Sequence, residues 1–110
     1  MPAGYVHLGW SSYAVLWLSR IPIPVPGHIA PRLATGAVRA AFEKQAAADW
    51  ESFLDLRARE LRPGGRLVVV VGAVNDSGVS GFEDTWNHGN AALVKMVDDG
   101  DITRDEHARW

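Results

Sequence analysis

The chain has 110 residues, 47% hydrophobic and 22% charged, a composition typical of one small globular domain rather than a disordered chain. Its formal net charge of −2 gives no electrostatic basis for binding nucleic acid or an anionic membrane surface. Because the chain contains no cysteine, disulfides and thiolate metal sites are excluded. No secretory signal or membrane-spanning segment is predicted, since the first basic residue, Arg20, follows the first apolar stretch, and we expect a cytoplasmic protein.

The chain is predicted to begin with a short strand and a helix. Residues 5–8 form an apolar run that ends at Gly9, which indicates a strand. Ser11 or Ser12 can then cap the first turn of a helix, because a hydroxyl accepts a hydrogen bond from the unpaired amides there. This helix is expected over residues 13–20.

On such a helix, Tyr13, Leu16 and Trp17 would share one face at spacings i, i+3 and i+4. The helix is expected to stop before Pro22, because a proline disfavours helical geometry in the residue that precedes it. Residues 21–31 contain four prolines and read as a stiff, extended connector lying against the surface.

A long amphipathic helix is predicted over residues 35–62, with Arg39 and Glu43 as an ion pair on its polar side. The RPGG sequence at residues 62–65 is expected to end this helix in a tight turn, pinned by Arg57 and Glu60. The residues expected on its apolar stripe are Val38, Phe42, Ala46, Trp50, Phe53, Leu54 and Leu61.

Residues 67–71 are continuous, mostly β-branched and apolar, which is typical of a strand covered on both faces in a helix-flanked parallel sheet. A further helix is expected over residues 81–98, opened by a capping box of Ser80 and Glu83 and ended at Gly100. Thr103 and Glu106 predict a second capping box. The fold class is therefore α/β, but two strands make a poor sheet on their own, so the sequence reads as half of a domain.

Self-sufficient catalytic motifs are not found in the sequence. The stretch VVVVGAVNDSG lacks the glycine cradle and the lysine of a nucleotide loop. The histidines are scattered, without ligand spacing, so no metal site is predicted: His7, His28, His88 and His107. Some aromatic residues remain, which either fill a core or line a pocket with one wet end: Trp10, Tyr13, Trp17 and Trp86.

Three stretches of the chain carry a resemblance: VHLGWSSYAVLWLSRIP, FEKQAAADWESFLDLRARELRPGGRLVVVVGA and TWNHGNAALVKMVDDGDIT. They are similar, in this order, to H-S-S-Y-S-L-x-W-L-S-x-x-P, Q-x-x-x-D-F-x-x-F-L-x-x-R-x-x-E-L-x-P-G-G-x-M-V-L and W-x-x-x-x-x-A-L-x-x-M-V-x-E-G-x-I. These segments occur in the SABATH family of carboxyl methyltransferases, the salicylic-acid, benzoic-acid and theobromine-type enzymes. The resemblance runs from about residue 5 to residue 106.

The resemblance implies methyl transfer from S-adenosylmethionine to a small carboxylic acid, on the second half of a Rossmann-like class I methyltransferase sheet and its helices. It implies no catalytic acid or base, because a carboxylate is already ionised at neutral pH and positioning supplies much of the rate. It places Ser11 and Ser12 near the methionine end of the cofactor. The residues it assigns to the substrate side are Tyr13, Leu16, Trp17, Thr85 and Trp86, with the Trp17 indole N–H donating to the acceptor carboxylate.

Three features of the family's cofactor site have no counterpart in this sequence: the glycine-rich loop after the first strand, the acidic residue that holds the ribose, and a serine-phenylalanine pair for the adenine. We therefore expect residues 1–110 to be a single partial domain, inactive alone and completed by a second copy or a complementing half. The asparagine with which some members bind an ion also has no counterpart in residues 21–31, so no metal is expected. Two alternatives stay open: a non-catalytic module that dimerises through its strand edges, and an unrelated domain whose aromatic face binds a hydrophobic ligand.

Overall fold

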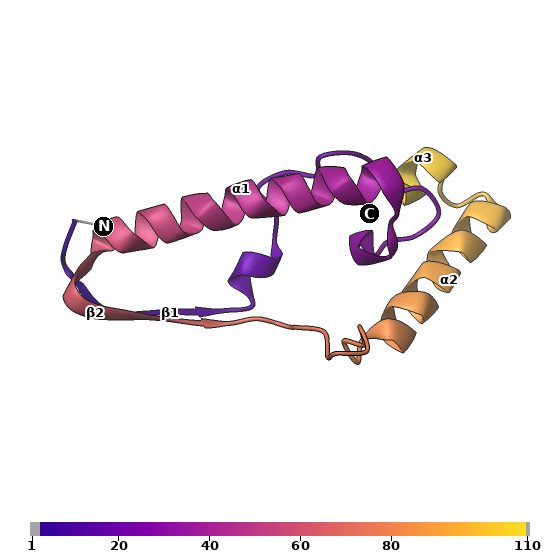
Figure 1. Ribbon diagram of the computed structural model, residues 1–110. Helices are drawn as coiled ribbons and strands as arrows, with labels where there is room; N and C mark the ends of the chain where they lie inside the picture. The colour runs from indigo at the N-terminus through magenta and orange to yellow at the C-terminus, as the bar shows by residue number, and fades with distance from the viewer. Residues whose placement is uncertain (1–2, 110) are drawn as a thin grey trace. The chain divides into compact units, whose positions relative to one another are not determined.

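The computed structural model of the chain describes residues 3–109 and forms two compact units (Figure 1). The strand unit comprises Met1–Arg20 and Lys44–Ala73, and the helical unit comprises Ile21–Glu43 and Val74–Trp110. The long helix α1 (Gly36–Glu60) begins in the helical unit and ends in the strand unit.

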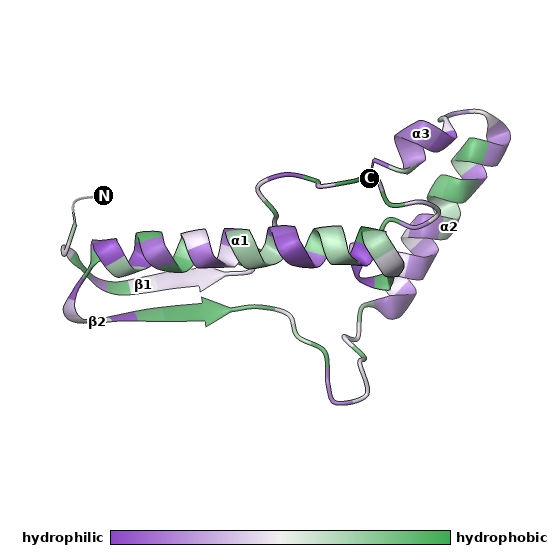
Figure 2. Ribbon diagram, turned by 45° about the horizontal axis from the view of Figure 1, so that its top comes forward, coloured by the Kyte–Doolittle hydropathy of each residue, from purple (hydrophilic) through white to green (hydrophobic). Residues whose placement is uncertain are grey.

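The strand unit is built on a parallel pair, β1 (Val6–Ser12) and β2 (Leu61–Val70), joined through α1. Figure 2 shows β2 as the more hydrophobic strand, in keeping with its run of valines. Within residues 3–109 the sheet has only these two strands, and Val68 and Val71 are 37% and 43% exposed. The predicted α/β class and parallel sheet are confirmed. Strand β2 has the composition of a strand covered on both faces, but here it is covered on one.

Strand β1 is longer than the sequence predicted, because Trp10, Ser11 and Ser12 pair in register with Val68, Val69 and Val70. Ser11 and Ser12 are therefore strand residues, and the prediction that they cap a helix is wrong. The predicted helix over residues 13–20 is also wrong. Only the short 3-10 helix η1 (Ala14–Leu16) forms there, since pairing with β2 outweighs the local preference of the serines for a cap.

The RPGG sequence lies within β2 as an irregularity of the ladder rather than as the predicted tight turn. The pairing passes from Val6 opposite Leu61 directly to Leu8 opposite Arg66, so β2 carries extra residues there. Gly64 supplies a φ of 77°, and a Cβ on Gly65 would lie 2.9 Å from two backbone oxygens, those of Arg62 and Val6. Arg57 and Glu60, the predicted supports of this connection, form a two-bond ion pair at 2.7 and 2.8 Å.

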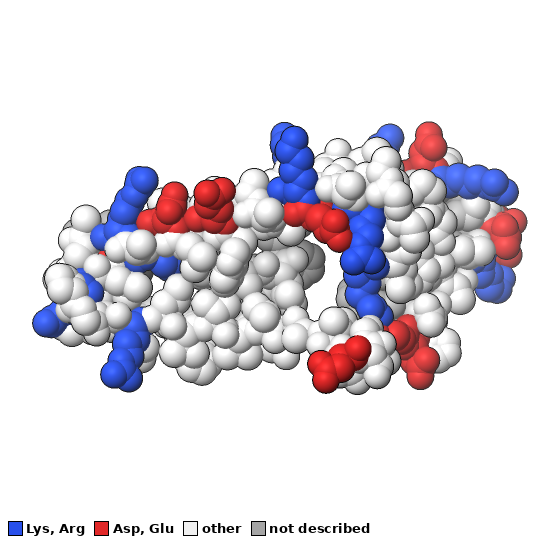
Figure 3. Space-filling model, in the orientation of Figure 1, with Lys and Arg blue, Asp and Glu red and all other residues white. Residues whose placement is uncertain are grey.

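Helix α1 covers one face of the strand pair with a stripe that is more polar than predicted. The residues of this stripe that are buried or half-buried are Gln45, Asp49, Phe53, Arg57 and Glu60. Three members of the predicted apolar stripe are instead exposed: Ala46, Trp50 and Leu54, the last two at 43% and 40%. Trp50 nevertheless stacks on Phe53 with ring centroids 5.5 Å apart. Charged side chains gather along α1 in Figure 3, whereas the surface over the strands is largely uncharged.

The helical unit contains the 3-10 helix η2 (Pro31–Leu33), α2 (Glu83–Asp99) and α3 (Arg104–His107). Gly100 ends α2 at a φ of 83°, where its amide donates to the Met96 and Val97 carbonyls, as predicted. The predicted capping box of Thr103 and Glu106 is confirmed in full. The predicted ion pair of Arg39 and Glu43 is also present. No helix within residues 3–109 is long and apolar enough to cross a bilayer.

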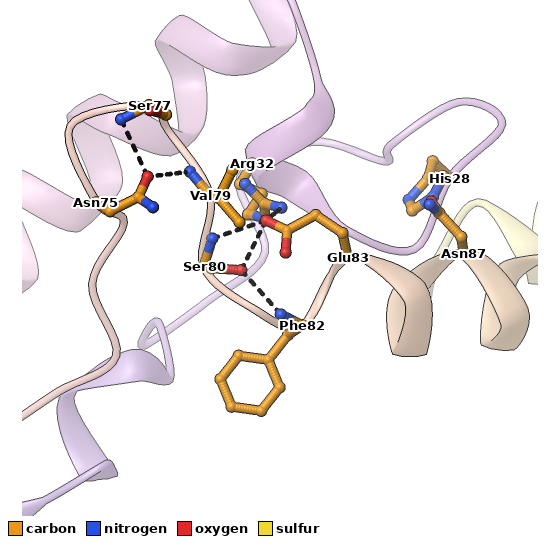
Figure 4. A network of polar contacts seen from close by, with 9 residues as sticks. All are labelled: His28, Arg32, Asn75, Ser77, Val79, Ser80, Phe82, Glu83 and Asn87. Carbon is orange, nitrogen blue, oxygen red and sulfur yellow. Dashed lines mark hydrogen bonds and ion pairs between the residues drawn. The ribbon is translucent and has the colours of Figure 1, made fainter.

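The loop before α2 is closed by side chains that bind neighbouring amides (Figure 4). Asn75 Oδ1 accepts from the Ser77 and Val79 amides at 3.0 and 2.9 Å. Glu83 accepts from the Ser80 amide and hydroxyl, but the Ser80 hydroxyl binds the amide of Phe82 rather than that of Glu83. The predicted capping box of Ser80 and Glu83 is therefore only half formed: Glu83 binds the Ser80 amide, but the Ser80 hydroxyl does not bind the Glu83 amide.

Asn90 joins three segments of the helical unit. Its Oδ1 accepts from the Ile29 amide and lies 3.1 Å from Nε2 of His107, and its amide nitrogen donates to the Gly27 carbonyl. Around these bonds lie the unit's buried residues, Val25 at 8%, Ala30 at 2% and His107 at 7% exposure. The connector over residues 21–31 is thus held against α2 and α3, as its apolar character predicted.

Candidate functional site

The carboxyl edge of the strand pair brings together several of the residues predicted for the site. Ligands of open α/β sheets bind at this edge, where parallel strands end. Immediately after β1, Tyr13 adopts φ 58° and ψ −2°, and its amide donates to the Val70 carbonyl at 2.8 Å. Such a conformation costs about 1–3 kcal/mol for a residue other than glycine, and strained residues of this kind cluster at functional sites. Tyr13 is the one non-glycine residue within residues 3–109 with positive φ.

The strained backbone turns the chain from β1 into η1. The Tyr13 ring lies over the end of β2, since a Cβ on Gly72 would come 3.9 Å from its Cε1. Trp17 follows η1 in an extended conformation, φ −88° and ψ 119°. Tyr13, Leu16 and Trp17 therefore do not form a helical face, and the prediction of a shared stripe is corrected. All three are exposed, Trp17 most of all at 83%.

Two hollows flank this segment within the strand unit. One, of about 470 Å³, lies between β1 and α1, with Trp10, Ser11 and Ser12 on one side and Phe53 and Arg57 on the other. The second, of about 320 Å³, has Trp17 and Leu18 on one wall and residues of α1 on the other: Ala46, Asp49, Trp50, Phe53 and Arg57. Trp17 thus combines an accessible indole with an adjoining space partly lined by apolar side chains.

Ser11 and Ser12, the residues predicted to face a cofactor, occupy the last positions of β1. Ser11 is half-buried and Ser12 is exposed. Both line the hollow of about 470 Å³ between β1 and α1. Within the strand unit, the segments that end β1 and β2, residues 10–17 and 68–73, contain no acidic side chain that could hold a ribose. The cofactor role of Ser11 and Ser12 stays a prediction.

Thr85 and Trp86, the remaining predicted substrate residues, lie in the first turn of α2 in the helical unit. Both are exposed, Trp86 at 42%. The covered side of α2 is formed instead by half-buried residues further along the helix: Gly89, Asn90, Leu93 and Val97. No group of three or more metal-ligating side chains occurs among the residues that the structure describes.

Sequence analysis missed a polar cluster directly after Trp17, which we call the Ser19 cluster: Ser19, Arg20, Gln45 and Asp49. The Ser19 amide and hydroxyl donate to the two carboxylate oxygens of Asp49 at 2.9 and 2.7 Å. The Ser19 amide, the strongest influence, holds the pKa of the Asp49 carboxyl below its usual value of 3.8. The QxxxD spacing within the second resembling stretch was the available signal, because residues four apart share a helical face.

Comparisons with known proteins agree on one family. The sequence profile of the SAM-dependent carboxyl methyltransferases matches residues 1–110. A protein of Arabidopsis thaliana described as a probable S-adenosylmethionine-dependent methyltransferase is 37% identical over 95 residues, which cover 78% of this chain and 26% of that protein. Salicylate carboxymethyltransferase of Clarkia breweri is 32% identical over 111 residues, covering 96% of this chain and 31% of the enzyme.

The fold gives the same result. A loganic acid methyltransferase solved with SAH superposes with a TM-score of 0.82 at 24% identity, over 100% of this chain and 35% of that protein. The chain thus spans about a third of the length of the relatives that it matches, and its strands and helices correspond to part of a Rossmann-like methyltransferase fold. The profile match over the whole chain, with these relatives, establishes that the chain belongs to the SAM-dependent carboxyl methyltransferase family, known as SABATH, whose cofactor is S-adenosylmethionine.

Proposed function

We propose that this chain supplies the acceptor side of a carboxyl methyltransferase site, in which Tyr13 and Trp17 hold the carboxylate of a small organic acid. The observation that carries the proposal is the presentation of Trp17. It follows a strained residue at the carboxyl edge of a parallel strand pair, is 83% exposed, and adjoins a hollow of about 320 Å³. A core tryptophan would be covered, whereas a donor to a ligand must be accessible.

The proposed mechanism requires these residues to bind and orient the acceptor. The Trp17 indole N–H donates a hydrogen bond to one carboxylate oxygen, which leaves the other oxygen free to attack. When bound, S-adenosylmethionine supplies an electrophilic methyl group on its sulfonium. Since the acceptor is already ionised, no side chain of this chain has to remove a proton. Leu16 and the Tyr13 ring limit the shape of the acid, and Ser11 and Ser12 face the polar end of the cofactor.

We infer that the strand unit works only when covered by polypeptide that carries the rest of the fold, in a longer form of this protein or in a second chain. Tyr5, Leu8 and Trp10 are 71%, 61% and 67% exposed, and no side chain among the described residues is both large and fully buried. Exposed apolar surface of this extent marks an interaction site.

The test is methyl transfer by the protein purified from its natural source, in the length and assembly in which it occurs there. Labelled S-adenosylmethionine and a panel of small carboxylic acids, including benzoate and salicylate, should give a labelled methyl ester with at least one acid. Trp17→Phe should lower kcat/KM by about 10- to 100-fold, since a hydrogen bond to a charged group contributes about 1.5–3 kcal/mol. Unchanged transfer by this variant would refute the assigned role.

The matched control is Trp50→Phe, because Trp50 lines the opposite wall of the same hollow and Phe preserves its stacking on Phe53. It should change kcat/KM less than threefold. Calorimetric titration of the isolated 110-residue chain with S-adenosylhomocysteine tests the second part of the proposal, that the strand unit needs further polypeptide. Tight binding by this chain alone would show that the strand unit needs no further polypeptide.

The exposed apolar residues also support a second function, a non-catalytic module that associates with another chain through the open strand pair. Under this alternative the protein at natural length would bind neither S-adenosylhomocysteine nor any acid of the panel. Substitution of Trp10 by a charged residue would then change the measured molar mass in solution, while Trp17→Phe would change nothing.

A further inference from the structure

The Ser19 cluster fixes the chain two residues beyond Trp17. Besides the two bonds from Ser19 to Asp49, the Gln45 amide nitrogen donates to Ser19 Oγ at 3.1 Å and to Asp49 Oδ1 at 3.0 Å. The Arg20 Nε donates to Gln45 Oε1 at 2.7 Å. Four hydrogen bonds therefore link the loop after η1 to α1.

These polar side chains occupy a position where apolar residues are the usual choice. Gln45 is 9% exposed, and Asp49 is half-buried on the covered stripe of α1. Burying an amide or a carboxylate is costly unless its hydrogen-bonding groups are matched. Here both oxygens of Asp49 and both ends of the Gln45 amide are used. A fully matched polar network of this kind favours one geometry, whereas an apolar contact would permit several.

The segment that carries Trp17 is attached at both ends, and the Ser19 cluster is the later attachment. At the other end, the Tyr13 amide binds the Val70 carbonyl of β2 at 2.8 Å. The Trp17 side chain is too exposed for packing to fix its position. The backbone between β2 and the Ser19 cluster therefore fixes the point at which the Trp17 side chain leaves the chain.

We propose that Gln45 and Asp49 are positioning residues for Trp17, which act through Ser19 to hold the indole N–H toward the acceptor. The effect on acceptor binding rests on the proposed function, whereas the effect on the conformation around Trp17 does not. A misplacement of about 1 Å at a site that works by orientation can cost about 100-fold in rate. The residues that hold Trp17 are then as important as the indole itself.

The conformational step is tested by NMR on the 110-residue chain. Asp49→Ala should speed hydrogen exchange of the Ser19 amide about tenfold, which corresponds to the loss of one hydrogen bond. It should also shift the Trp17 indole resonance, assigned with Trp17→Phe. Asp55→Ala, which removes an exposed carboxylate from the same helix, should change neither. An unchanged Ser19 amide and indole in Asp49→Ala would overturn the proposal.

Two substitutions of Ser19 distinguish loss of the hydroxyl bond from a general loss of structure. Ser19→Thr keeps a hydroxyl that can bind Asp49 and should leave the Trp17 indole resonance in place. Ser19→Ala removes the hydroxyl from an exposed loop and should shift it. Equal effects of the two substitutions would contradict a role for the hydroxyl bond.

Benzoate is the probe for the effect on acceptor binding. Two quantities are measured: the shift that benzoate causes in the Trp17 indole resonance, and the KM for benzoate in the protein at natural length. We expect Asp49→Ala to raise the KM for the acceptor about tenfold with a smaller change in kcat. If benzoate acts on wild type and on Asp49→Ala alike, the positioning role fails. If wild type neither responds to benzoate nor transfers methyl, while Asp49→Ala still frees Ser19, the proposed function fails and the conformational role stands.

Discussion

The two units differ in the sequence separation of the residues whose contacts shape their loops and helix ends. In the helical unit, loop and helix ends are closed by neighbours, as Ser80 with Glu83 and Thr103 with Glu106. In the strand unit, the decisive contacts join distant segments: β1 with β2, and Ser19 with Asp49 thirty residues away. The candidate acceptor residues Tyr13 and Trp17 lie in the second kind of structure. Their placement therefore depends on pairings that no local signal specifies.

The strand unit should be the more sensitive to a change at its pairing irregularity. Gly65→Ala would bring a Cβ to 2.9 Å from the Arg62 and Val6 carbonyl oxygens, both backbone atoms that cannot move independently. We expect a loss of about 1–3 kcal/mol in the free energy of unfolding, measured by urea titration. Gly72→Ala is the control, because its Cβ would meet only an ordinary contact at 3.9 Å. Equal effects at both positions would show that the strands do not pair with this register.

The helical unit is also joined over long sequence distances, most densely at Asn90, which binds Gly27, Ile29 and His107. Asn90→Ala deprives the Ile29 amide and His107 of their acceptor and should cost about 1–3 kcal/mol. Hydrogen exchange should then accelerate at the Val25 amide, which binds the Ala108 carbonyl. Asn87→Ala, which removes a single exposed contact with His28 at 3.4 Å, should cost less than half as much. A result in the opposite order would move the centre of the unit away from Asn90.

The strained backbone of Tyr13 lies in the strand unit, next to the candidate site. At a φ of 58°, Tyr13→Gly should be more stable than Tyr13→Ala by about 1 kcal/mol, since glycine alone adopts this conformation without cost. At Val15, within η1, the order should reverse and alanine should be the better substitute. Urea titration of the four variants measures both differences, and the same order at both positions would mean that Tyr13 is not strained.

Sequence reasoning succeeded where local chemistry decides the structure. The Gly100 cap, the Thr103 box, the long helix and the class of the sheet were all predicted, because glycine, hydroxyl and β-branched residues act within one turn or one strand. It failed at Ser11 and Ser12, where pairing with Val69 and Val70 replaces a favourable cap by a strand. The family resemblance directed attention to Trp17, although the helix on which it was placed does not form. The hollow beside Trp17 could not be predicted, because it depends on how α1 lies against β1, which sequence periodicity does not specify.

The smallest expected effect concerns Glu83 and is confined to acid. The Ser80 amide bond, helped by the Ser80 hydroxyl and by Arg32, lowers the pKa of the Glu83 carboxyl from 4.5 to about 2. A carboxyl whose pKa is lower in the folded state stabilises it above the unfolded value, and this contribution is lost as the pH falls through the folded pKa. Glu83→Gln should therefore flatten the decline in melting temperature between pH 4.5 and about 2.

The exposed Glu51 on α1 provides the control, since Glu51→Gln leaves the Ser80 bonds intact. Its melting temperature should follow the wild-type pH profile through the same interval, and an NMR titration should place the Glu83 carboxyl near a pKa of 2. If Glu83→Gln and wild type decline in parallel, the start of α2 does not depend on this charge. The acid sensitivity of the chain would then rest on the other carboxyls whose pKa is lowered in the fold, Asp49 and Glu60 in the strand unit and Glu106 in the helical unit.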